Sequence, residues 1–217
     1  MKTGILFDLD GTLLSTLEDL TDAVNYMLRH YGLPERTIEE VRTFVGYGAE
    51  HLIRCSLPGK ASDPEVAEAL ATYQCYYATH SKIKTRPYDG ILQALEQIHR
   101  EFPIAIVSNK PDIATKPLCR DYFGGDIFAL GQSDAFPKKP APDMLRGAMQ
   151  AIGVENCIYV GDSEVDVQTA KNAGVPCLSV LWGFRDKECL TNHGATNFCD
   201  TPKNLLHCLK EMIENGK

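Results

Sequence analysis

Residues 4–16 read GILFDLDGTLLST. The apolar run at residues 5–7 has the length and content of a buried β-strand. Asp8 and Asp10 follow at once, and two carboxylates this close at the end of a buried strand repel each other unless a cation or a proton offsets them. One interpretation is a solvated strand end with an Asp-Gly turn. The other is a nucleophile, an acid and a metal site at the carboxyl end of a parallel sheet, where open α/β folds bind ligands.

Composition and charge limit the classes of protein to which this chain can belong. Its 217 residues suit one domain, or one domain with a sizeable insertion. Hydrophobic residues make up 44% and charged residues 24% of the chain, as in ordinary globular proteins. The net charge of −7 argues against a surface for nucleic acid or anionic membranes. No apolar run approaches the ~18 residues that a membrane helix needs.

The N-terminus and the cysteines indicate the cellular compartment. The first residues lead directly into the predicted strand, so we expect no targeting signal there. Eight cysteines occur without any Cys-x-x-Cys pair, a pattern typical of reduced thiols and not of a disulfide framework. We therefore expect a cytoplasmic protein, monomeric or homodimeric, that acts on a small molecule and binds neither nucleic acid nor membrane.

The segment from about residue 15 to residue 87 has helical periodicity and no convincing strand pattern. Four helices are expected there: one with Thr16 as its N-cap, one after a capping box of Thr37 and Glu40, one through Leu52, and one opened by Asp63-Pro64.

After residue 87, helical patterns alternate with short apolar runs. The expected strands are 104–107, 127–130, 157–160, 176–181 and 196–199, and the expected helices are 90–100, 113–122, 143–152, 165–173 and 205–215. This alternation predicts an α/β fold, a Rossmann-like parallel sheet with helices on both faces. Because 73 residues are far too many for an ordinary crossover, we expect a helical cap domain at residues 15–87, inserted into a core of residues 1–14 and 88–217. The two joins are the expected hinges.

Polar side chains follow successive predicted strands, and parallel strands bring their carboxyl ends to one edge. They are Asp8 and Asp10 after the first, Ser108 and Asn109 after the second, and Asp162, followed by Glu164 and Asp166, after the strand at 157–160; Lys139 lies in the stiff segment KKPAP. Carboxylates with a backbone carbonyl offer the hard oxygen ligands that Mg²⁺ prefers. A hydroxyl and an ammonium group suit phosphoryl oxygens. Each residue alone has a plain structural interpretation, as a helix cap, a solvated lysine or a turn residue. Their joint occurrence favours a site.

The phrases FDLDGT, SN, KP and GDSEVD, in this order, resemble the haloacid dehalogenase superfamily. The insertion after the first strand is similar to the small-substrate phosphatase branch of that superfamily. FVGYGAEHL, RPYDGI, VSNKP and WGFRDKECLTNHGATNF resemble the phosphoglycolate phosphatases, so the resemblance extends over nearly the whole chain.

This resemblance implies a role for each acid at the predicted sheet edge. Asp8 is the expected nucleophile, which forms an aspartyl-phosphate. Asp10 is expected to protonate the leaving alkoxide and then to act as base on the hydrolytic water. Asp8, the main-chain carbonyl of Asp10, and Asp162 are the expected Mg²⁺ ligands, with Asp166 in support.

The resemblance also implies a phosphate pocket and a substrate-binding cap. Ser108 and Lys139 are expected to bind the phosphoryl oxygens, and Asn109 to help shape their pocket. In the cap, Gly46 and Gly48 would let the main chain approach the substrate, and Arg42 would meet a substrate carboxylate. Trp182, Phe184 and Arg185 have two interpretations, an edge of the site or core packing with a surface salt bridge.

Other functions fit the motifs less well. A dinucleotide-binding fold needs Gly-x-Gly-x-x-Gly after the first strand, where Asp-Gly-Thr stands instead. A phospho-acceptor signalling module needs neither the insertion nor Asp10, and a dehalogenase has no leaving group for Asp10 to protonate. A non-catalytic phosphate-binding module stays possible in principle. A sugar phosphomutase or a pyrophosphatase could share the whole core, since the cap decides what enters the site.

Overall fold

The predicted first strand lies in the middle of a parallel sheet. The structure, a computed structural model, describes residues 2–216. Six strands pair in parallel in the order β5-β4-β1-β6-β7-β8. Their bounds are Thr3–Phe7 for β1, Ile104–Pro111 for β4, Phe128–Gln132 for β5, Asn156–Gly161 for β6, Cys177–Val180 for β7 and Asn197–Cys199 for β8. The predicted α/β class with a parallel sheet is confirmed.

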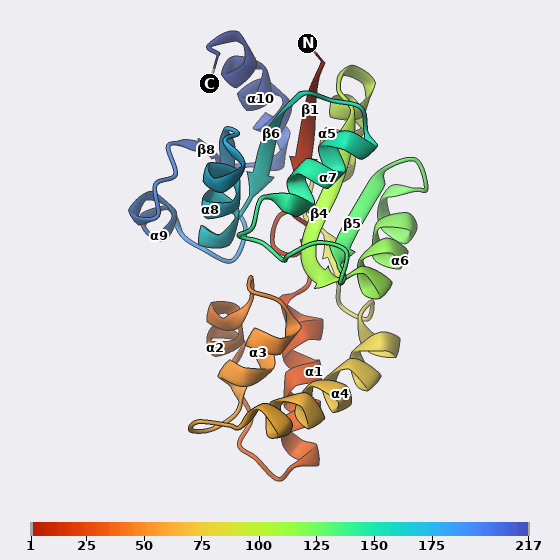
Figure 1. The fold of residues 1–217 in the computed structure, drawn as a ribbon, viewed down its shortest axis with the longest axis vertical. Helices are drawn as coiled ribbons and strands as arrows, with labels where there is room; N and C mark the ends of the chain where they lie inside the picture. The colour runs from red at the N-terminus through yellow and green to blue at the C-terminus, as the bar shows by residue number, and fades with distance from the viewer. Residues whose placement is uncertain (1, 217) are drawn as a thin grey trace.

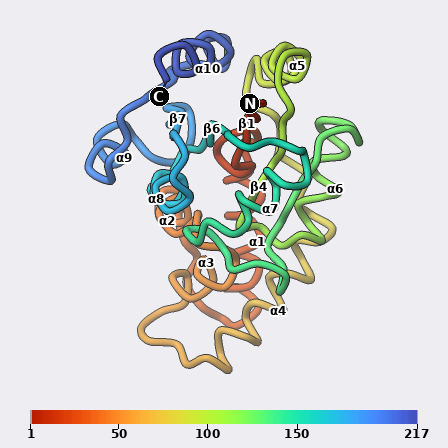
Figure 2. Tube along the Cα trace, turned by 45° about the horizontal axis from the view of Figure 1, so that its top comes forward, coloured from red at the N-terminus to blue at the C-terminus, as the bar shows by residue number. Residues whose placement is uncertain are grey.

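Helices cover both faces of this sheet (Figure 1, Figure 2). They are α5 (Ile91–Glu101), α6 (Asp112–Phe123), α7 (Asp143–Ala151), α8 (Glu164–Ala173) and α10 (Leu205–Glu214); a short helix α9 (Lys187–Asn192) and a 3-10 turn (Pro202–Asn204) add to the predicted elements. Along β1, Ile5 and Phe7 pack in a cluster with α5, α6 and α10, whereas Leu6 packs with α7 and α8. Because β1 is buried on both faces, its apolar residues do not alternate with polar ones.

Four helices fill the long segment between β1 and α5 and lie as a group below the sheet in Figure 1. They are α1 (Leu17–His30), α2 (Ile38–Phe44), α3 (Ala49–Ser56) and α4 (Asp63–His80). The group buries a cluster of its own that includes Val24, Ile53 and Tyr73 and takes in Phe184 from the loop after β7. The predicted helical insertion is therefore present. Within residues 2–216, no helix is long and apolar enough to cross a bilayer.

The N-cap residues of these helices agree with the prediction at α1 and α2 and differ at α4. Thr37 and Glu40 form the expected capping box at α2. Thr16 is the N-cap residue of α1 as predicted, although its buried hydroxyl makes no capping hydrogen bond and has no partner in the described chain. At α4 the N-cap is Ser62, one residue earlier than predicted, because its backbone N–H and its hydroxyl both donate to Glu65.

The two joins of the insertion pair with each other, which the sequence analysis did not predict. β2 (Leu14–Ser15) and β3 (Arg86–Pro87) form a two-stranded antiparallel ribbon. The Asp19 carboxylate accepts hydrogen bonds from two backbone N–H groups just before β3, so the start of α1 is tied to the returning chain. We propose that this ribbon is the hinge between a cap domain and a core, at residues 15–87 and at residues 1–14 and 88–217.

Candidate active site

A cavity of about 610 Å³ lies where the carboxyl ends of β1, β4 and β6 face the inserted helices. Most of the predicted site residues line it: Asp8, Asp10, Ser108, Asn109, Lys139 and Asp162 from the sheet edge, and Gly46 and Gly48 from the segment between α2 and α3. Arg42 is exposed and is not part of the cavity wall. The strand-end residues therefore meet as predicted, whereas the structure does not bring the predicted carboxylate-binding arginine to the site.

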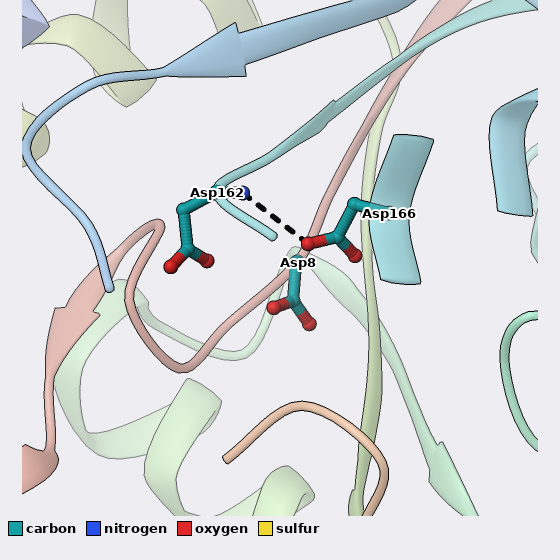
Figure 3. Close-up of side chains that lie close together, drawn as sticks. All are labelled: Asp8, Asp162 and Asp166. Carbon is teal, nitrogen blue, oxygen red and sulfur yellow. Dashed lines mark hydrogen bonds between the residues drawn. The ribbon is translucent and has the colours of Figure 1, made fainter. Parts of the chain in front are cut away.

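Three buried carboxylates lie close together at this site (Figure 3), and two of them, Asp8 and Asp162, line the cavity. Asp8, Asp162 and Asp166 each offer one oxygen atom, and these oxygens lie within 4.8 Å of one another. Burial, and then the charge of Asp166, raise the pKa of Asp162 well above its ordinary value. Burial also raises the pKa of Asp8 to about 7, although Lys139 opposes the shift. The negative charge of this cluster is not fully offset by nearby positive groups, and carboxylate oxygens are the hard ligands that divalent cations prefer. The residues present therefore suit the predicted Mg²⁺.

Lys139 supplies positive charge to this acid cluster. Its ammonium group donates to Asp8 Oδ1 at 2.7 Å, Asp166 Oδ1 at 2.9 Å and the Tyr159 hydroxyl at 2.8 Å. Burial would raise the pKa of Asp166, but Lys139 and a hydrogen bond from Ser163 hold that pKa below its ordinary value. Asp166 Oδ2 also accepts the backbone N–H groups of Asp162 and Ser163. Asp166 therefore stays ionised and orders the loop after β6, which suits the expected supporting role.

Asp162 is oriented by groups from two other loops. Its Oδ1 accepts a hydrogen bond from the Thr12 hydroxyl at 3.0 Å, and its Oδ2 accepts the Phe184 backbone N–H at 2.7 Å. Gly11 packs against the same carboxylate with a φ of +89°, and a β-carbon there would fall 2.3 Å from Asp162 Oδ2. Glycine after the second aspartate is thus required by both the turn and the space.

Asp10 has a partner that sequence reasoning missed. The Lys110 ammonium lies 3.1 Å from Asp10 Oδ1 and 3.0 Å from Oδ2. The Lys110 side chain is only 4% exposed, and its nitrogen stands 4.8 Å from the centre of the Tyr77 ring on α4. The predicted strand ends at residue 107, whereas β4 continues to Pro111, so Lys110 is part of the strand end. The sequence has a lysine directly after the predicted Ser-Asn pair, and this position was the signal that could have indicated a cation at the strand end.

Asn109 connects the cavity wall to the backbone of two other segments. Its side-chain amide donates to the carbonyl oxygens of Gly46 and Lys139, and its side-chain oxygen accepts the Lys139 backbone N–H. The amide therefore positions Lys139 and the glycine segment, which matches the expected role of shaping the pocket. Gly48 comes close enough that a β-carbon on it would lie 3.3 Å from the Asn109 carbonyl oxygen.

The loop after β7 contacts both the acid cluster and the insertion. The Trp182 indole donates to the Thr12 carbonyl oxygen, in the turn beside the acids. The Arg185 guanidinium pairs with Glu164 at 2.7 Å and donates to backbone carbonyls at the end of α2, among them those of Arg42 and Val45. Phe184 lines the cavity and also packs in the core of the insertion, so both of these predicted features are present. The predicted surface position of the salt bridge is wrong, because the Arg185 and Glu164 side chains are largely buried.

This arrangement of acids, lysine and inserted helices identifies a class of enzyme. The chain belongs to the haloacid dehalogenase-like hydrolase family, which matches residues 5–180. The resemblance noted in the sequence motifs is therefore confirmed at the level of the family.

Individual relatives narrow the comparison to phosphatases. Phosphoglycolate phosphatase 1 of Pseudomonas aeruginosa is 34% identical over 220 residues, which cover 97% of this chain and 80% of that protein. The phosphoglycolate phosphatase of Rhodobacter capsulatus is 36% identical over 196 residues, 85% and 87% of the two chains. A crystal structure from Lactobacillus delbrueckii subsp. bulgaricus, provisionally named phosphoglycolate phosphatase, has a TM-score of 0.88 and 35% identity over 96% of this chain and 99% of that one. The predicted enzyme class, a haloacid dehalogenase-like hydrolase of the phosphatase type, is confirmed.

Proposed function

We propose that this protein is a Mg²⁺-dependent phosphatase that hydrolyses a small phosphomonoester, of which 2-phosphoglycolate is the leading example, through an aspartyl-phosphate on Asp8. The observation that carries the proposal is the buried contact of Asp8 with Lys139, on the cavity wall and beside Asp162. Buried charges that are mutually repulsive and face a cavity favour a functional site over a structural one. The relatives named phosphoglycolate phosphatase support the reaction class and the choice of substrate.

In the proposed reaction, Asp8 and Asp10 take different parts. Asp8 Oδ1 is held by Lys139, whereas Oδ2 accepts no hydrogen bond from residues 2–216 and is the oxygen available to attack phosphorus. A bond forms between that oxygen and phosphorus as the bond to the leaving alkoxide breaks. Asp10 gives its proton to the alkoxide, and then takes a proton from the water that hydrolyses the aspartyl-phosphate.

The other residues supply charge and position. Mg²⁺, when bound, supplies positive charge that offsets the carboxylates and the phosphoryl oxygens. Its proposed ligands are Asp8, the main-chain carbonyl of Asp10 and Asp162, supported by Asp166; the proposed phosphoryl-binding groups are Ser108 and Lys139, both 2% exposed. The wall formed by Asn109, Gly46 and Gly48 limits the space around the leaving group. Eight free cysteines favour the cytoplasm as the place of action, and a monomer or homodimer is proposed.

The test measures phosphate release from a panel of small phosphoesters that includes 2-phosphoglycolate, sugar phosphates and pyrophosphate, with Mg²⁺ and with excess chelator. We expect Mg²⁺-dependent release that is fastest with a small phosphomonoester. Fastest release from pyrophosphate would identify a pyrophosphatase, and isomerised sugar phosphate without release a mutase. Phosphate binding without turnover would indicate a non-catalytic module, and undiminished turnover in excess chelator would remove the metal from the proposal.

A further inference from the structure

Three lysines line the cavity, and they differ in whether an N–H group of the ammonium remains available to a ligand. An ammonium group has three N–H donors. Those of Lys139 meet Asp8, Asp166 and Tyr159, so without substrate this lysine has no spare donor, and under the proposed function a donor that it frees serves the phosphoryl group. Lys82 is ion-paired with Asp121, and both side chains are nearly half exposed at the cavity mouth.

Lys110 is buried and also has one N–H group that Asp10 does not use. Two of its N–H groups serve the two oxygens of Asp10, and no other residue between 2 and 216 accepts the third. The face of the Tyr77 ring at 4.8 Å stabilises the charge in an otherwise apolar wall that includes Leu118 and Tyr73. The third N–H is therefore available to an acceptor that enters the cavity.

The position of this donor selects a kind of acceptor. Under the proposed function, Asp10 protonates the bridging oxygen of the ester and must come within hydrogen-bond distance of it. The Lys110 ammonium group lies 3.0 Å from the Asp10 carboxyl group. When Asp10 contacts the bridging oxygen, Lys110 is therefore close to that oxygen as well. In 2-phosphoglycolate two bonds separate the bridging oxygen from the carboxylate carbon, which places an anionic oxygen in the same neighbourhood.

We propose that Lys110 is the specificity-determining residue that binds a carboxylate on the leaving group of the substrate. The inference rests on the proposed phosphatase function and takes over the role that the sequence analysis gave to Arg42. Arg42 is exposed, and no arginine or histidine belongs to the cavity wall formed by the described residues. Lys110 binds the carboxylate with one N–H and keeps Asp10 in place with the other two.

The experiment compares two esters that differ in the carboxylate alone, 2-phosphoglycolate and ethyl phosphate. Both release a two-carbon alkoxide that needs the proton from Asp10. For Lys110→Met we expect the ratio of the two kcat/KM values, phosphoglycolate over ethyl phosphate, to fall by about 10- to 100-fold, as for a lost charge-assisted hydrogen bond. Lys110→Arg should restore most of the ratio. The matched control is Lys82→Met, which removes a cavity lysine at the exposed mouth and should leave the ratio within about twofold.

The outcomes separate this inference from the proposed function. If Lys110→Met lowers turnover of both esters equally, Lys110 only positions Asp10 and the inference is wrong, while the phosphatase function stands. A wild-type preference for ethyl phosphate would also overturn the inference. If the wild-type protein with Mg²⁺ hydrolyses no ester, the proposed function fails with it. Thermal unfolding of each variant, followed by circular dichroism, shows whether a lower rate reflects a loss of folded protein.

Discussion

The sheet edge and the helical insertion contribute to the same cavity in different ways. The edge supplies charges: Asp8, Asp162 and Lys139 are buried there, Lys139 pairs with Asp8, and one oxygen of Asp8 lies within 4.8 Å of one oxygen of Asp162. The insertion supplies mainly apolar walls and backbone, such as Leu52, Tyr73 and Gly46. The chemistry of this enzyme is therefore concentrated in the strand ends, and the shape of its pocket depends on how the insertion is held against them.

Replacing the nucleophile gives the sharpest test of this division of labour. For Asp8→Asn we expect kcat for any phosphomonoester to fall by roughly 10⁴-fold or more, as when the nucleophile of a covalent mechanism is removed. The fold should persist, because the amide has the same shape and relieves repulsion from the other acids. Phosphate release and thermal unfolding are measured on the same preparation, and wild-type rates in the folded variant would contradict the assignment.

The same division explains what could be predicted from the sequence. In a parallel sheet all strands end at one edge, so Asp8, Ser108 and Asp162 could be brought together from strand periodicity alone. Lys110 was missed because the expected strand stopped at residue 107, whereas β4 continues through a register shift to Pro111. Tyr159 was missed although a phenol in a buried apolar strand needs a partner.

Predictions for the insertion depended on information that helical spacing does not contain. Helical spacing is sufficient to assign Val41 of α2 to a buried face, and Val41 is buried in the cluster of the insertion. The spacing could not determine how α2 is rotated and packed against the sheet edge, and this rotation leaves Arg42 exposed. The contacts of Arg185 with α2 join residues far apart in the chain, and only the tertiary packing creates them.

The second largest effect is expected at the second acid. Asp10→Asn should lower kcat for ethyl phosphate by about 10²- to 10⁴-fold, because the alkoxide leaves unprotonated and the hydrolytic water has no base. With p-nitrophenyl phosphate, whose leaving group is already stable as an anion, the rate of the first step should fall much less. Burst kinetics separate the two steps, and equal losses for both esters in the first step would contradict the acid role.

The buried acids should also give the metal-free protein a distinctive pH dependence of stability. The pKa of Asp8 is raised to about 7 from an ordinary 3.8 by burial, so between these values the folded state holds a proton that the unfolded state has released. The free energy of unfolding should therefore fall as pH rises from about 4 to about 7, by up to about 4 kcal/mol from Asp8 alone.

Denaturant unfolding in excess chelator at several pH values measures this slope. Mg²⁺ should flatten it, since the cation binds the ionised acids in the folded state. Asp8→Asn should remove the part of the slope that Asp8 contributes without metal and leave the part from Asp162, whose pKa is also raised by burial, so this variant is the control. A stability difference between the wild type and Asp8→Asn that stays constant over this pH range in chelator would show that Asp8 is already ionised in the folded protein, and that Lys139 outweighs burial.

The smallest effect is expected where the two regions are joined. Arg185 donates to the carbonyls of Arg42 and Val45 at 2.7 and 2.9 Å and pairs with Glu164, with both charged side chains largely buried. These contacts hold the end of α2, and so the glycine segment that follows it, against the sheet edge. Arg185→Met should loosen that segment and raise KM for 2-phosphoglycolate by about tenfold, with a smaller change in kcat.

The matched control is Arg54→Met, which removes an arginine on α3 whose partners, Glu50 and Asp63, are exposed. Because exposed pairs contribute little, this variant should change neither KM nor kcat by more than about twofold. If both variants behave alike, the insertion is held by its apolar packing alone. If Arg185→Met lowers kcat and leaves KM unchanged, Arg185 acts through Glu164 on the loop of Asp162. Arg185 would then support the catalytic residues of the sheet edge and not the position of the insertion.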